Sequence, residues 1–238
     1  MRTIGGAICL TNERTYFKRA EMKNDLTEYY AKRASEYEAI YAKPERQADL
    51  ESATKMLQEI FKEKDVLEIA CGTGFWTEKI AKTARSVLAT DINESVLEIA
   101  RSKIYPNGNV AFKAADLHQL QPQKLTAALF GGFIWSHIPV QELPDFVRKA
   151  NSLVPPKGTI VMMDNRYVEG SSTPIFSRDE FGNTYQQRRL QNGEAYTVLK
   201  NFPSQSDIEN VLKDNCSSFQ FIQLQYFWIA VWQTTTPF

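Results

Sequence analysis

A short segment of the chain places an acidic residue and two glycines within a few positions of each other. Residues 66–76 read VLEIACGTGFW, so Glu68 lies four residues before Gly72, and Gly74 follows two residues later. A glycine turn between a strand and a helix lets the backbone approach a ligand closely at the carboxyl end of the strand. This segment is therefore the first candidate for a ligand site.

Two further acidic residues end the next strand-like runs. Asp91 closes the run VLATD, and Asp116 follows the run VAFKAA. A carboxylate at the end of such a strand can accept both hydroxyls of a ribose. Acidic residues at three successive strand ends suit a nucleoside, whereas the alternative is that each of them caps the helix that follows it.

The glycine pattern does not complete a dinucleotide fingerprint. A third glycine is expected three residues after Gly74, and Thr77 stands there instead. A nicotinamide-dependent oxidoreductase therefore remains an alternative reading rather than the preferred one.

The spacing of Glu68, Gly72 and Gly74 resembles the first motif of the class I S-adenosylmethionine-dependent methyltransferases. The resemblance extends over roughly residues 29–165, with Thr126 where the family often has an aspartate. It implies a Rossmann-like α/β fold with a mostly parallel seven-stranded sheet, helices on both faces and, here, an inserted β-hairpin cover. It also implies S-adenosyl-L-methionine as cofactor and in-line methyl transfer to an oxygen or nitrogen of a small molecule.

The resemblance assigns residues to the cofactor one by one. The acidic residue orients it, the glycines pass beneath its methionine portion, Asp116 lies at the adenine amino group and Leu117 lies beside the ring. The full set expected to bind the cofactor is Tyr30, Glu68, Ala70, Gly72, Gly74, Trp76, Asp91, Ile92, Asp116, Leu117 and Ser136. For Trp76 the alternative is a place in the core.

His137 is the candidate catalytic residue. It follows the fourth strand-like run, whose end faces the reactive sulfonium in the resembling family. A histidine there can act as a general base toward a hydroxyl or amine. The alternative is a histidine that only packs and hydrogen-bonds, because positioning and exclusion of water supply most of the catalysis when the leaving group is already activated.

The elements that position these residues follow from the alternation of apolar runs and helical periods, which indicates a parallel sheet covered by helices. The expected strands are 66–70, 87–90, 110–114, 127–135 and 159–163, and the expected helices between them are 76–84, 94–103 and 141–153. An Asn-Gly turn at residues 191–194 predicts a hairpin. Ser206 and Glu209 predict a capping box for a later helix, and residues 219–224 and 226–232 predict two closing strands.

Some parts of the chain lie outside this regular alternation of strands and helices. We expect residues 1–21 to form a loose extension and residues 22–238 a single domain, in which residues 166–202 cover the substrate. Tyr29, Tyr30, Ala34 and Tyr37 match a helix that related methyltransferases use as a lid, although such tyrosines could equally cover the sheet.

Composition excludes other classes of function. The 238 residues carry a formal net charge of +0, so no basic field favours nucleic acid, and no apolar run is long enough to span a membrane. The three cysteines form no metal motif, which predicts reduced thiols, no metal and a cytoplasmic location. A noncatalytic partner protein on a degenerate methyltransferase fold is the remaining alternative, and the oligomeric state is left open.

Overall fold

The computed structural model describes residues 29, 32, 33, 38, 40–122, 126–190 and 192–235. The extension expected at residues 1–21, Tyr30 and the other lid positions Ala34 and Tyr37 lie outside the described residues. No helix in the described part is long and apolar enough to cross a membrane.

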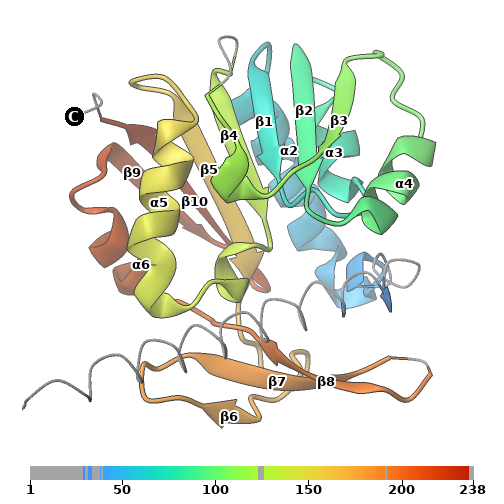
Figure 1. The fold of residues 1–238 in the computed structure, drawn as a ribbon, viewed down its shortest axis with the longest axis vertical. Helices are drawn as coiled ribbons and strands as arrows, with labels where there is room; N and C mark the ends of the chain where they lie inside the picture. Colours follow the sequence, from blue (N-terminus) through green and yellow to red (C-terminus); the bar gives the residue numbers. More distant parts are fainter. Residues whose placement is uncertain are drawn as a thin grey trace, which may run out of the picture.

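A seven-stranded sheet in the order β3-β2-β1-β4-β5-β10-β9 forms the centre of the molecule (Figure 1). The strands β1 to β5 pair in parallel, and β10 lies antiparallel to both β5 and β9. Their bounds are β1 Asp65–Ile69, β2 Ser86–Asp91, β3 Val110–Ala114, β4 Ala128–Gly132, β5 Thr159–Asn165, β9 Cys216–Gln223 and β10 Phe227–Thr234. This arrangement confirms the predicted fold class.

Alternate side chains of the strands face two separate helical layers, as expected for a sheet buried on both faces. Val66 of β1 packs with one group of helices, whereas the next residue, Leu67, packs with the other. The first group is α2 Gln47–Phe61, α3 Phe75–Ile80 and α4 Glu94–Ser102. The second group is α5 Leu143–Ser152 and α6 Gln205–Leu212.

The order of the strands reverses at β1, because its two neighbours are β2 on one side and β4 on the other. In an open parallel sheet, ligands bind at the carboxyl ends of the strands at such a reversal. The loops that follow β1, β2, β3 and β4 therefore meet at the edge where a site is expected.

A small antiparallel sheet is inserted between β5 and α6 and lies beyond that edge of the main sheet (Figure 1). It consists of β6 Ser177–Arg178, β7 Thr184–Arg189 and β8 Ala195–Leu199. Asn192 and Gly193, with φ +90° at the glycine, lie in the loop between β7 and β8. The hairpin predicted from the Asn-Gly pair is confirmed, and β6 adds a third strand.

Two local predictions are wrong in detail. The capping box uses Ser204 and Asp207, two residues before the predicted pair Ser206 and Glu209. The predicted strand 127–135 ends at Gly132, because Phe133 takes a left-handed φ of +61° that an extended strand does not allow. The chain then continues into the 3₁₀ turn η4, Trp135–His137.

Candidate active site

The turn after β1 is built from left-handed backbone. Ala70, Gly72 and Gly74 have φ angles of +51°, +55° and +79°. A Cβ added to Gly74 would lie 2.7 Å from Tyr105 Oη and 3.1 Å from Ala100 Cβ, so only glycine lets the turn pack against α4. Ala70 carries a Cβ, so its positive φ is unfavourable for the backbone. Non-glycine residues held in this conformation cluster at functional sites.

Asp91, at the end of β2, holds this turn. Its Oδ2 accepts the Gly72 N–H at 2.9 Å, and its Oδ1 accepts the Asn93 N–H at 2.9 Å. Burial raises the pKa of Asp91, and the amide hydrogen bonds act against that shift. Each carboxylate oxygen has two lone pairs, so both can accept a further hydrogen bond from a ligand hydroxyl. The neighbouring Ile92 is 49% exposed and presents an apolar surface beside them.

Glu68 lies inside β1 with only 1% of its surface exposed. Its Oε2 has no hydrogen-bond partner among the described residues. Burial raises the pKa of Glu68 to about 8, Thr77 opposes this shift, and the charge of Asp91 adds to it. A buried polar atom without a partner is rare and calls for an explanation. A ligand that brings a hydrogen-bond donor to the turn would supply the missing partner.

Other residues expected to bind the cofactor also make contacts within the protein. Asp116 Oδ1 accepts the His118 N–H at 2.9 Å and caps the 3₁₀ turn η3, Leu117–Gln119. Trp76 is 3% exposed and packs edge-on against Phe75 and Phe130. Trp76 therefore lies in the aromatic core, and its assignment to the cofactor stays a prediction.

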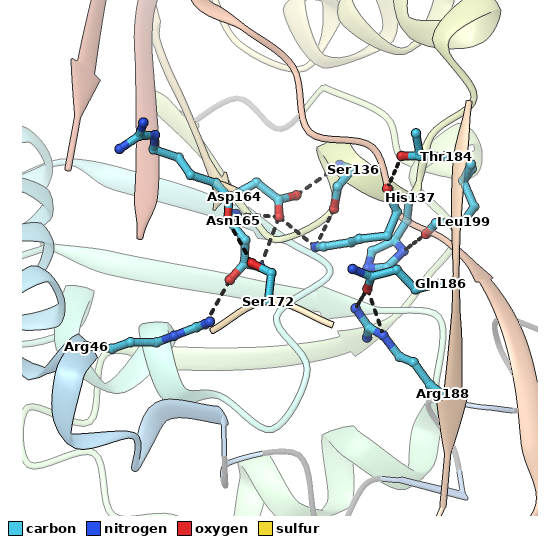
Figure 2. A network of polar contacts seen from close by, with 12 residues as sticks. Arg46, Ser136, His137, Asp164, Asn165, Ser172, Thr184, Gln186, Arg188 and Leu199 are labelled. Atoms are coloured by element: carbon cyan, nitrogen blue, oxygen red, sulfur yellow. Dashed lines mark hydrogen bonds and ion pairs between the residues drawn. The ribbon is translucent and has the colours of Figure 1, made fainter. Parts of the chain in front are cut away.

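A buried ion pair that the sequence analysis missed lies beside the turn after β4. Lys200 Nζ donates to Asp164 Oδ1 at 2.8 Å and to Ser136 Oγ at 2.5 Å, and the Ser136 N–H donates to Asp164 Oδ2 at 2.9 Å. Asp164 and Ser136 face each other at the centre of Figure 2. Burial alone would raise the pKa of Asp164, but Lys200 and the other donors hold it below its ordinary value.

The missed pair had one signal in the sequence. Asp164 is a fourth acidic residue at a strand end, following the apolar run of β5. Lys200 follows β8 in the inserted sheet, far along the chain, and no local pattern distinguishes it from a surface lysine.

His137 lies in η4 next to this pair. Its Nδ1 donates to the Leu199 carbonyl oxygen at 2.7 Å (Figure 2). A carbonyl only accepts, so Nδ1 carries the proton of the neutral ring and Nε2 carries the lone pair. Burial lowers the pKa of His137 well below its usual value, and the positive charge of Lys200 lowers it further. The ring is therefore neutral and its tautomer is fixed.

A cavity of about 350 Å³ lies between the carboxyl edge of the main sheet and the inserted sheet. Its walls come from the loops after β4 and β5, from the inserted sheet and from the segment that precedes α2. The lining residues are Tyr29, Arg33, Ile40, Lys43, Arg46, Phe133, His137, Asn165, Ser171, Ser172, Thr173, Gln186, Gln187, Arg188, Arg189, Lys200 and Phe202.

Comparisons with known proteins agree with this geometry. Residues 66–158 match the family model of a methyltransferase domain. The chain is 25% identical to DhpI in its complex with SAH, with a TM-score of 0.75 and coverage of 91% of this chain and 98% of that one. It is 26% identical to DhpI in a complex with SAM and HEP, with a TM-score of 0.72 and coverage of 89% and 97%.

More distant structures share the fold. The PH0226 protein from Pyrococcus horikoshii OT3 is 18% identical with a TM-score of 0.66, and the match covers 84% of this chain and 99% of that one. No protein of curated function matches the sequence at a significant level.

The buried carboxyl of Glu68 predicts a pH-dependent stability. Its pKa is about 8 in the folded protein against roughly 4.3 in an unfolded chain, so between these values only the folded state keeps the proton. The free energy of unfolding should therefore decrease as pH rises from about 4 to about 8. In Glu68→Gln the free energy of unfolding should fall by a few kcal/mol less over the same pH range, as measured by urea unfolding at each pH.

Glu59→Gln, on the exposed side of α2, is the matched control and should leave the pH profile unchanged. A Glu68→Gln variant with the wild-type profile would show that Glu68 ionises normally in the folded protein.

The fixed tautomer of His137 is measurable by long-range ¹H–¹⁵N NMR. We expect a protonated Nδ1, an unprotonated Nε2, and no titration of this ring in the range where an ordinary histidine titrates. The chain has two histidines, so His118→Gln assigns the signals and leaves the Leu199 contact of His137 in place. A protonated Nε2, or a titration near the ordinary histidine pKa, would refute the assigned state.

Proposed function

We propose that this chain, a class I S-adenosylmethionine-dependent methyltransferase, methylates an oxygen or nitrogen of a small molecule by in-line displacement. One observation carries the proposal. The cavity of about 350 Å³ opens at the same edge of the sheet as the glycine turn, and His137 lines it. A volume of this order suits a small ligand rather than a polymer.

The residues around the turn after β1 fit the cofactor. A nucleoside linked to an amino acid has polar and apolar parts, and these residues can contact both. Oε2 of Glu68 has no hydrogen-bond donor among the described residues, the oxygens of Asp91 can accept further hydrogen bonds, and Ile92 exposes an apolar side chain. S-Adenosylmethionine supplies a methyl group activated by a positively charged sulfur. We assign its binding to Glu68, Ala70, Gly72, Gly74, Asp91, Ile92, Asp116, Leu117 and Ser136.

The acceptor would be held in the cavity next to η4. Nε2 of His137 carries the lone pair, so a hydroxyl or ammonium group bound beside it can lose its proton to this atom. The low basicity of the ring limits this role to an acceptor that becomes acidic as its bond to the methyl group forms. Residues 166–202, which include the inserted sheet, would exclude water from the cavity.

Titration of the purified protein tests the cofactor assignment. SAM and SAH should bind and raise the melting temperature, whereas NAD should not. Asp91→Ala should weaken SAH binding by about 10- to 100-fold, because a hydrogen bond to a charged group contributes roughly 1.5 to 3 kcal/mol. Asp145→Ala, which removes an exposed carboxylate of α5, is the control and should bind SAH normally.

The acceptor class is tested separately by incubating a cell extract with the enzyme and SAM labelled in the methyl group. Label in the low-molecular-weight fraction supports the proposal. Label confined to protein or nucleic acid would contradict a small-molecule acceptor. Wild-type SAH affinity in Asp91→Ala would contradict the assignment of the cofactor site.

A further inference from the structure

The two edge strands of the main sheet differ in length and charge (Figure 1). β3 is short and carries Lys113. β9 is longer and reads CSSFQFIQ, with no charged residue, no proline and no glycine. Natural proteins block exposed edges with short strands, charged side chains or proline, because an unpaired edge is a template for another strand. β9 has none of these three features.

β9 pairs with β10 along one side only. The Leu224 N–H, just after β9, donates to the Phe227 carbonyl at 2.9 Å, so Leu224 turns its N–H toward β10. Because the hydrogen-bonding groups alternate sides along an antiparallel ladder, Phe219, Phe221 and Gln223 turn theirs away from β10. Among the described residues, no backbone hydrogen bond to another segment uses these outward groups. The outer edge can therefore accept a further strand.

A bulge limits the regular part of this edge. The pairing of β9 with β10 shifts between Gln233 and Thr234, where Ser217 is the extra residue on β9. The regular run is therefore 218–224, and Phe221 stands at its centre. A strand that pairs antiparallel with a copy of itself needs such a centre, because two-fold symmetry makes the two sides of the contact equivalent.

Phe221 already belongs to a group of rings on one face of the sheet. Its ring is stacked on Trp228, with centroids 6.2 Å apart and planes inclined by 20°, and the Phe219 ring follows at 6.5 Å. Both phenylalanines are only partly buried, so part of each ring remains exposed to solvent. A second strand would cover these rings, and cross-strand aromatic pairs stabilise antiparallel sheets.

We propose that β9 binds a second copy of this chain, whose own β9 adds antiparallel to it and forms one continuous sheet across a two-fold axis at Phe221. Phe221 then pairs with Phe221 of the second copy, and Phe219 pairs with Gln223 of the second copy on either side of the axis. Each pair exchanges both of its N–H···O=C hydrogen bonds through groups that face away from β10. Because β9 carries no charge, two identical edges meet without repulsion.

The size of this contact predicts its strength. Pairing is confined to one strand from each copy, so the interface belongs to the small and weak class, and the dimer should dissociate on dilution. The glycine turn follows β1, which is separated from β9 by β4, β5 and β10. Association at this edge should therefore leave SAH binding unchanged, and the inference does not depend on the acceptor proposed above.

Charged residues at Gln220 test the pairing. This side chain is exposed, its backbone faces β10, and in the dimer the two copies of it lie diagonally across the axis. Sedimentation equilibrium of the full chain at increasing concentration should show a monomer–dimer equilibrium. Gln220→Lys and Gln220→Glu should each weaken it by about threefold or more, because like charges then lie across the axis. An equimolar mixture of the two variants should dimerise again, because the charges are then opposite.

Two further variants separate the edge from general effects of charge and folding. Gln223→Pro removes an outward N–H that β10 does not use, and it should abolish the dimer. Thr197→Lys adds the same charge as Gln220→Lys on an exposed position of β8, and it should leave association unchanged. A thermal shift with SAH reports whether each variant is folded. If Gln223→Pro does not fold, the Gln220 variants and their mixture decide the result alone.

Three results would overturn the inference. A monomer at every concentration would show that β9 does not pair with its own copy. A dimer of wild-type strength in both Gln220 variants and in Gln223→Pro would place the contact elsewhere on the molecule. Weak association that the mixture of the two Gln220 variants does not restore would contradict the antiparallel arrangement about Phe221. SAH binding in any of these cases would leave the methyltransferase assignment intact.

Discussion

The ion pair between Lys200 and Asp164 is the contact on which the shape of the site depends. Both side chains are almost completely buried, at 3% and 0% exposed. Removing two charges from water is costly, and the cost is offset here because Ser136 supplies an amide donor to Asp164 and a hydroxyl acceptor to Lys200. Asp164 lies in β5, Ser136 lies in η4 and Lys200 directly follows β8, so the pair ties the inserted sheet to the edge of the main sheet.

Several features of the site follow from this tie. Once Lys200 is fixed, the neighbouring Leu199 carbonyl meets His137 Nδ1 and sets the tautomer of the ring. The Asn201 N–H then donates to the Ser136 carbonyl at 2.8 Å, which closes the junction. The inserted sheet is thereby held over the strand ends, and the space between them becomes a cavity with walls from both parts.

The sequence predicted the parts of this structure that depend on local patterns. The strand runs and the glycine turn located β1 to β5 and the carboxyl edge, and the Asn-Gly pair located the β7–β8 hairpin. The early end of the fourth strand has a physical cause, because the left-handed φ of Phe133 is not encoded by residue type. The Lys200–Asp164 pair joins segments more than thirty residues apart, so no local period reveals it.

Hydrogen–deuterium exchange of the Lys200→Met variant tests this account most directly. If the ion pair holds the inserted sheet on the main sheet, the amides of β7 and β8 should lose protection, while those of β1, β4 and β5 keep it, since exchange reports local opening. Unchanged protection in β7 and β8 would contradict the account, because the inserted sheet would then be held without the buried pair.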